Sequence, residues 1–132
     1  MNEFKMTFVV LCTTLSTWLG GFDELLTVLV VFMIVDYITG VCCAIIEHKL
    51  SSAVGAKGIL RKVLILVLVA VANAIDVHII EGDQPILRTA VIFFYLSNEG
   101  ISILENSARI GLPIPQKLRE FLNQIKDRDS SR

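Results

Sequence analysis

Charged residues are scarce in this sequence, and neither sign is in excess. Only 19% of the 132 residues are charged, and 12 Lys and Arg stand against 13 Asp and Glu, so the formal net charge is -1. Soluble domains carry about 25% charged residues, and nucleic-acid-binding domains usually gather a basic excess on one face. We therefore expect no nucleic-acid partner, and the low charge favours a membrane protein.

Residues that usually carry chemistry are also few. The three cysteines, Cys12, Cys42 and Cys43, all lie in apolar runs, and an odd number with two adjacent members does not indicate a disulfide framework. The two histidines, His48 and His78, are predicted to lie on opposite faces of the membrane, so we do not expect them to share a site. No zinc-ligand spacing, nucleophile elbow or complete phosphate-binding loop is present. We expect no catalytic residue, metal or cofactor, and we predict that the protein is not an enzyme.

Apolar residues in long runs dominate the chain instead, at 54% of the sequence with a mean hydropathy of +0.68. The range 25–46 extends roughly 33 Å as a helix, which is enough to cross a bilayer. The ranges 63–80 and 86–104 extend roughly 27 and 28 Å, so their flanking residues must reach the interfaces. The range 4–21 is diluted by Thr and Ser, and it either crosses the membrane or lies in the interface. These runs predict a single-domain, all-α integral membrane protein with three or four transmembrane helices.

The charges in the connections alternate from one segment to the next. Acidic residues follow the ranges 4–21 and 63–80, whereas basic residues follow 25–46 and 86–104, and only Arg88 among the basic residues falls on the acidic side. Because basic residues in short connections stay in the cytoplasm, four crossings with both termini cytoplasmic fit this pattern. The predicted cytoplasmic anchors are Lys49, Lys57, Arg61, Lys62, Arg109, Lys117 and Arg119.

The first segment has two further interpretations. Lys5, the apolar stretch after it and the small pair Gly20–Gly21 imitate a cleaved signal peptide, although the Thr-rich centre argues for a retained helix. Initiation at Met6 would give a shorter form without Lys5, whose charge opposes movement of the N-terminus across an energised membrane by about 2.3 kcal/mol per 100 mV. A single start at Met1 is the simpler expectation.

Polar residues also lie inside the predicted membrane segments. An acidic residue such as Asp36, near the middle of 25–46, costs roughly 2.5–3.5 kcal/mol on an insertion scale, so we expect it to face another helix rather than lipid. The residues predicted to mediate helix association are Asp36, Gly40, Asn73, Asp76, Tyr95, Asn98, Glu99, Ser102 and Glu105. Hydrogen bonds within a static monomer or oligomer would also explain these residues. Intramembrane acids occur in proton-coupled transporters as well.

The chain changes character after the last apolar range. Gly111, Pro113 and Pro115 are typical of a helix end. An apolar stripe lies beyond them, in the range 116–132, and consists of Leu118, Phe121, Leu122 and Ile125. With its basic flanks, this stripe predicts a short amphipathic cytoplasmic helix on the membrane surface.

Several short motifs occur in a fixed order along the chain. They are DYITG at 36–40, SS at 51–52, Gly55, KG at 57–58, RK at 61–62, NEGISILEN at 98–106 and GLPIPQKL at 111–118. In this order and at these distances they resemble the toxin-secretion/phage-lysis holins, small membrane proteins of phages and of clostridial toxin loci. The resemblance covers most of the chain and is most specific at 98–106, whereas the region before Leu25 gains little support from it.

The resemblance implies a holin, which accumulates in the cytoplasmic membrane of the host bacterium and assembles into lesions at a set time. A muralytic endolysin then passes to the cell wall, and this partnership needs no direct contact. The implied partners are further copies of the chain, the lipid bilayer and, functionally, an endolysin. The residues predicted above for helix association would then also line the lesion. A toxin-export pore, which the same family includes, and a small proton-linked transporter are the alternatives.

Overall fold

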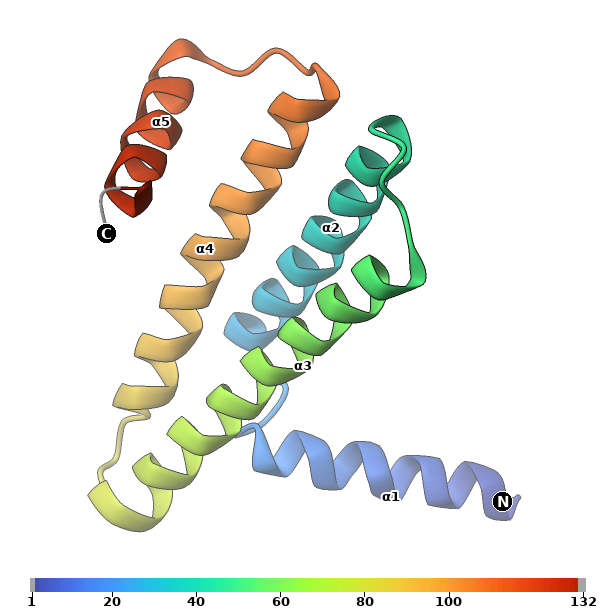
Figure 1. Ribbon diagram of the computed structural model, residues 1–132. Helices are drawn as coiled ribbons and strands as arrows, with labels where there is room; N and C mark the ends of the chain where they lie inside the picture. The colour runs from blue at the N-terminus through green and yellow to red at the C-terminus, as the bar shows by residue number, and fades with distance from the viewer. Residues whose placement is uncertain (1, 131–132) are drawn as a thin grey trace.

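Helices account for nearly all of residues 2–130, which are the part of the chain that the structure, a computed structural model, describes (Figure 1). They are α1 (Glu3–Trp18), α2 (Glu24–Ile46), α3 (Ser52–Ile75), the π-helical turn η1 (Asp76–Ile80), α4 (Ile86–Ile110) and α5 (Gln116–Ser130). No strand occurs among these described residues. The predicted all-α fold class is therefore confirmed.

Within residues 2–130, three helices are long and apolar enough to cross a membrane, namely Glu24–Ile46, Ser52–Ile80 (α3 with η1) and Ile86–Ile110. This agrees with the prediction of three or four transmembrane helices. The second of them begins well before residue 63, because the Ser51 side chain accepts a hydrogen bond from the Val54 amide at 3.1 Å and caps the helix.

The early start of α3 changes the position of three predicted anchors. Lys57, Arg61 and Lys62 lie inside α3 rather than in the connection between two membrane helices. Lys57 and Arg61 are exposed, as an anchor requires, whereas Lys62 is partly buried. The apolar run alone marked only the later part of this helix.

The apolar core lies where α2, α3 and α4 meet. It consists of Leu26, Leu29, Met33, Val69 and Ile92, each at most 5% exposed. Many other large apolar side chains of these helices face outward, and lipid tails can cover them. In Figure 1, α3 approaches α4 near η1 and diverges from it toward its Ser52 end.

The helix α1 stands apart from this bundle. None of its side chains is buried, and its 16 residues run across the direction of the three long helices (Figure 1). It ends at Trp18, before the end of the predicted range 4–21, and Gly20 and Gly21 follow with φ values of +87° and +93°. Glycine adopts this left-handed conformation without steric strain, so the two glycines allow the abrupt change of direction before α2.

The helix α5 occupies the range predicted for the amphipathic tail. It follows a turn from Gly111, the C-cap of α4, and its side chains Leu118 and Phe121 are 36% and 51% exposed. Residues 131–132 of the predicted tail, and the side chains of Leu122 and Ile125, lie outside the described part of the chain.

Candidate functional site

A charged cluster of Asp36, Lys62 and Glu99 connects the three long helices. The Nζ atom of Lys62 in α3 donates hydrogen bonds to Asp36 Oδ2 in α2 and to Glu99 Oε2 in α4, each at 2.7 Å. The three side chains are only 13%, 17% and 8% exposed, in the order of the chain. Asp36 and Glu99 lie near the middle of their helices, so one ammonium group holds three helices together deep within the predicted membrane region.

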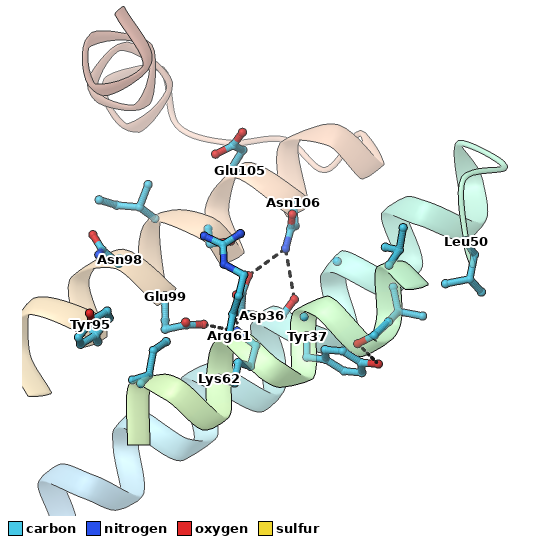
Figure 2. Close-up of a pocket in the computed structure, with 18 residues that line it drawn as sticks. Asp36, Tyr37, Leu50, Arg61, Lys62, Tyr95, Asn98, Glu99, Glu105 and Asn106 are labelled. Atoms are coloured by element: carbon cyan, nitrogen blue, oxygen red, sulfur yellow. Dashed lines mark hydrogen bonds and ion pairs between the residues drawn. The ribbon is translucent and has the colours of Figure 1, made fainter. Parts of the chain in front are cut away.

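Asn106 of α4 extends the charged cluster toward the connection between α2 and α3. Its Nδ2 atom donates to Asp36 Oδ1 at 3.1 Å (Figure 2). The same atom donates to Thr39 Oγ1 at 3.0 Å, and the backbone carbonyl of Asn106 accepts from Cys43 Sγ at 3.2 Å. A Cβ atom on Gly40 would lie 3.6 Å from the Asn106 side chain. The face of α2 that contains Asp36 and Gly40 therefore contacts α4, as the sequence predicted for Asp36.

Tyr37 of α2 lies so close to α3 that it leaves little room for a side chain at Gly55 or Gly58. The side chain of Tyr37 packs on both glycines: an added Cβ would lie 3.3 Å from its hydroxyl oxygen at Gly55 and 3.2 Å from its ring at Gly58. The hydroxyl also donates to the Gly55 carbonyl at 3.4 Å. Larger side chains at these two positions would push α3 away from α2 and from the acids that Lys62 contacts.

The charged cluster lies in the wall of a polar pocket of about 620 Å³ between α2, α3 and α4 (Figure 2). Tyr95, Asn98, Ser102 and Glu105, all predicted for helix association, line this pocket from α4. Arg61 lines it from α3, and Asn98 is exposed. Polar groups at this depth require protein or water as neighbours, because lipid tails offer no hydrogen bonds.

A second polar site, the Arg88 clasp, lies at the opposite end of the bundle and consists of Arg88, Leu19, Gly21 and Asp23. The guanidinium donates to the Leu19 carbonyl at 2.6 Å, to the Gly21 carbonyl at 2.9 Å and to Asp23 Oδ2 at 2.8 Å. The Arg88 side chain is 3% exposed, whereas that of Asp23 is 50% exposed. The hydrogen bonds from Arg88 lower the pKa of Asp23 below its ordinary value of 3.8.

Asn73 and Asp76 lie beside the Arg88 clasp and not in the charged cluster. The carboxylate of Asp76, which is 4% exposed, accepts hydrogen bonds from the Leu87 and Arg88 amides at 3.0 and 2.8 Å, so it caps the start of α4. Asn73 Nδ2 donates to the Trp18 carbonyl at 3.1 Å. The predicted helix-association residues therefore form two separate groups.

A surface ion pair joins α2 and α4 at the end that contains the predicted anchors. Arg109 donates to both carboxylate oxygens of Glu47, at 3.1 and 2.7 Å, and lowers the pKa of Glu47 below its ordinary value of 4.5. Lys49 lies 3.9 Å from the same carboxylate, and Lys117 and Arg119 are exposed in α5.

Sequence reasoning did not identify the roles of Lys62, Arg88 and Asn106. Lys62 was predicted only as an anchor, but a strong N-cap at Ser51 would have placed it inside a helix beside other spans. Arg88 was the one basic residue predicted on the acidic side of the membrane. A buried cation at that position needs a carboxylate partner, and Asp23 lies on the same side. Asn106 is the last residue of the motif at 98–106, but it was not predicted for helix association, because that prediction rested on the polar residues from Tyr95 to Glu105.

Comparison with known proteins decides the family, since the chain matches the model of the bacteriophage holin family over residues 13–127. The chain belongs to the bacteriophage holin family. This confirms the resemblance to holins, and membership points to a non-enzymatic, multi-pass membrane protein.

Similar chains occur in phages and in several bacteria. A protein described as a probable holin of Bacillus phage phi105 is 39% identical over 109 residues, which cover 83% of this chain and 79% of the relative. An uncharacterized 14.9 kDa protein of Clostridium perfringens is 43% identical over 116 residues, 87% of each chain. An uncharacterized protein of Listeria monocytogenes is 48% identical over 103 residues, 78% of this chain and 72% of the relative. No solved structure matches the chain.

Proposed function

We propose that this holin oligomerises in the cytoplasmic membrane of its host and, at a set time, forms lesions through which an endolysin reaches the cell wall. The observation that carries the proposal is the polar pocket with its charged cluster, which lies within three apolar helices. The chain itself performs no catalysis in this role. The endolysin depends on the lesion and needs no contact with the holin.

The physical reason lies in the polar face of α4. Asn98 is exposed and Ser102 is only partly buried on this face, so a single chain leaves polar groups open toward lipid. Polar side chains in a membrane are satisfied by neighbouring helices or by water. Further copies can cover these groups first, and water can cover them once enough copies gather.

The decisive experiment records membrane potential and culture density after induction in bacteria, with and without a cytoplasmic endolysin. We expect the potential to collapse abruptly after a lag and the culture to clear only when endolysin is present. Continued growth with an intact potential, at an expression level verified in membranes, would contradict the lesion model. Saturable substrate flux under those conditions would favour a proton-linked transporter, and dependence of toxin release on the chain would favour an export pore.

A matched pair of variants tests the role of the pocket face. Asn98→Leu removes an exposed amide that lines the pocket, and we expect it to delay lysis and change the size of cross-linked oligomers. Ser97→Leu is the control, because the Ser97 hydroxyl is exposed but donates to its own helix at the Phe93 carbonyl, 2.9 Å away. Equal effects of the two variants on timing and oligomer size would refute the assignment.

A further inference from the structure

We propose that α1 is not a fourth membrane crossing but an interfacial helix, which lies on the phospholipid surface at the end of the bundle where η1 joins α4. The N-terminus would then lie on the same side of the membrane as the connection between η1 and α4. This inference concerns topology and does not depend on lesion formation.

The direction of α1 is set by polar contacts at its C-terminal end. Arg88 binds the carbonyls of Leu19 and Gly21, and Asn73 binds the carbonyl of Trp18. Gly20 fits tightly between them, because a Cβ atom there would lie 2.5 Å from Asn73 Oδ1. The end of α1 is thus attached to α3 and α4 through its backbone.

This attachment determines how α1 meets the membrane. The three long helices define the membrane normal, since each is able to span it. Figure 1 shows α1 leaving one end of this bundle across that direction. A helix in that position extends along the membrane surface rather than through the bilayer.

The length of α1 supports the same conclusion. Its 16 residues extend about 24 Å as a helix, whereas the hydrocarbon core of a bilayer is about 30 Å thick. None of its side chains is buried against the rest of the chain. The helix is therefore shorter than the hydrocarbon core, and its side chains are not buried among the three long helices.

The side chains of α1 suit the boundary between headgroups and acyl chains. Exposed apolar side chains extend along the helix, from Phe4 (79% exposed) to Trp18 (60% exposed). The hydroxyls of Thr13, Thr14 and Thr17 each donate to the carbonyl four residues earlier, at 2.8 to 2.9 Å. Because these hydroxyls are already hydrogen-bonded within α1, they require neither water nor a partner chain as an acceptor. The apolar side chains of α1 can therefore insert about 5–10 Å into the boundary.

The charges indicate which face of the membrane carries α1. The charge of Arg88 is paired with Asp23, so Arg88 is no free cytoplasmic anchor. The other charged residues near this end include Glu81 and Asp83, whereas most of the exposed basic residues lie at the opposite end. Lys5 of α1 is the exception, and the acidic Glu3 lies two residues before it. By the positive-inside rule, α1 and the N-terminus lie on the outer face.

Cysteine labelling in protoplasts tests the side of the N-terminus. In a chain whose three cysteines are replaced by serine, Asn2→Cys, Asp83→Cys and Lys49→Cys are each exposed to a membrane-impermeant maleimide while the membrane potential is intact. We expect Asn2→Cys to be labelled like Asp83→Cys and unlike Lys49→Cys. Labelling of Asn2→Cys that follows Lys49→Cys would show a fourth crossing and overturn the proposal.

Tryptophan fluorescence tests the depth of α1, because Trp18 is the only tryptophan. The full chain is placed in phosphatidylglycerol and phosphatidylcholine vesicles whose lipids carry bromine either near the headgroup or near the end of the acyl chain. The matched variant is Trp18→Phe combined with Leu11→Trp, which moves the probe to the middle of α1. We expect quenching mainly by the shallow bromines at both positions.

Two outcomes of this measurement would overturn the proposal. Stronger quenching by the deep bromines at position 11 would show that α1 crosses the bilayer. Absence of quenching at both positions would show that a second copy or water covers the helix. Neither outcome depends on whether the protein lyses cells, so a failure here is distinct from a failure of the lesion model.

Discussion

The charged cluster and the Arg88 clasp each bury one cation in the same bundle, but the two cations bind different kinds of partner. Lys62 binds two carboxylates that belong to two other membrane helices. Arg88 binds two backbone carbonyls and one carboxylate, and that carboxylate, from Asp23, is 50% exposed. The comparison indicates that the charged cluster sets how the long helices pack, whereas the clasp sets where α1 leaves them.

Removal of the shared cation from the charged cluster has the largest expected effect. Lys62→Leu leaves Asp36 and Glu99 facing each other without their shared cation, and loss of one partner from a buried ion pair costs about 3–5 kcal/mol. We expect Lys62→Leu to lower the thermal unfolding midpoint in detergent strongly and to abolish lysis. The exposed Lys57 on the same helix gives the control Lys57→Leu, which should change neither.

A triple variant separates the contribution of the charged cluster to stability from the role that we propose for it in the lesion. Leucine at Asp36, Lys62 and Glu99 together replaces the ion pairs by apolar contacts, which is often neutral for stability. We expect the unfolding midpoint to recover and lysis to remain absent. Recovery of normal lysis timing would show that the charges serve packing alone.

Loss of the clasp has the next largest effect. Arg88→Leu removes the hydrogen-bond donors to the linker, which is the connection between α1 and α2 at residues 19–23. We expect a loss of about 2–4 kcal/mol in the free energy of unfolding. The loss is smaller than for Lys62 because water can hydrate the half-exposed Asp23. Arg88→Lys should recover only part of it, because an ammonium group cannot reproduce the planar fork of donors. Full recovery by lysine would mean that charge alone, and not the geometry of the clasp, matters.

The apolar runs predicted the three long helices because hydrophobic length is decided locally along the chain. Asp36 contacts Lys62 of α3 and Asn106 of α4, and an acid in a membrane is costly wherever it faces lipid. The role of Lys62 could not be predicted in this way. A lysine beside an apolar run gives the same sequence pattern whether it lies at the membrane interface or forms an ion pair inside the bundle.

Asn73 and Asp76 show what residue type alone cannot predict. They were grouped with Asp36 and Glu99 as intramembrane polar residues, but α3 runs from one polar site to the other. Asp76 lies roughly 21 Å beyond Lys62 along the helix axis, at 1.5 Å per residue. Which acid meets which cation depends on the direction of each helix, and the pairing of Arg88 with Asp23 connects residues 65 positions apart.

Two neighbouring glycines, Gly20 and Gly21, test how tightly the Arg88 clasp is packed. Gly20→Ala and Gly21→Ala both place alanine at a positive φ, but only the Cβ at position 20 meets neighbours, at 2.5 Å from Asn73 Oδ1 and 2.6 Å from Arg88 Nε. We expect Gly20→Ala to destabilise the protein by about 1 kcal/mol more than Gly21→Ala, since a Cβ in a filled space forces its neighbours to move. Equal unfolding midpoints in detergent would show that the linker is not held as tightly as the clasp requires.

The pH dependence of stability provides the smallest effect and distinguishes the clasp from the rest of the bundle. The pKa of Asp23 is lowered below its ordinary value of 3.8 by its hydrogen bonds with Arg88, so the folded state binds fewer protons at this site than the unfolded state. The contribution of Asp23 is fully present above its ordinary pKa and is lost as the pH falls through the lowered pKa.

Asp23→Asn is the matched variant for this measurement, because asparagine also caps a helix but does not titrate. We expect the difference in unfolding midpoint between the parent chain and Asp23→Asn to be constant near neutral pH and to shrink as the pH falls below about 4. The exposed half of the carboxylate keeps this difference small. A difference that stays constant down to the acid unfolding of both chains would show that Arg88 holds the linker through its carbonyls alone, and Asp23 would then act only as the cap of α2.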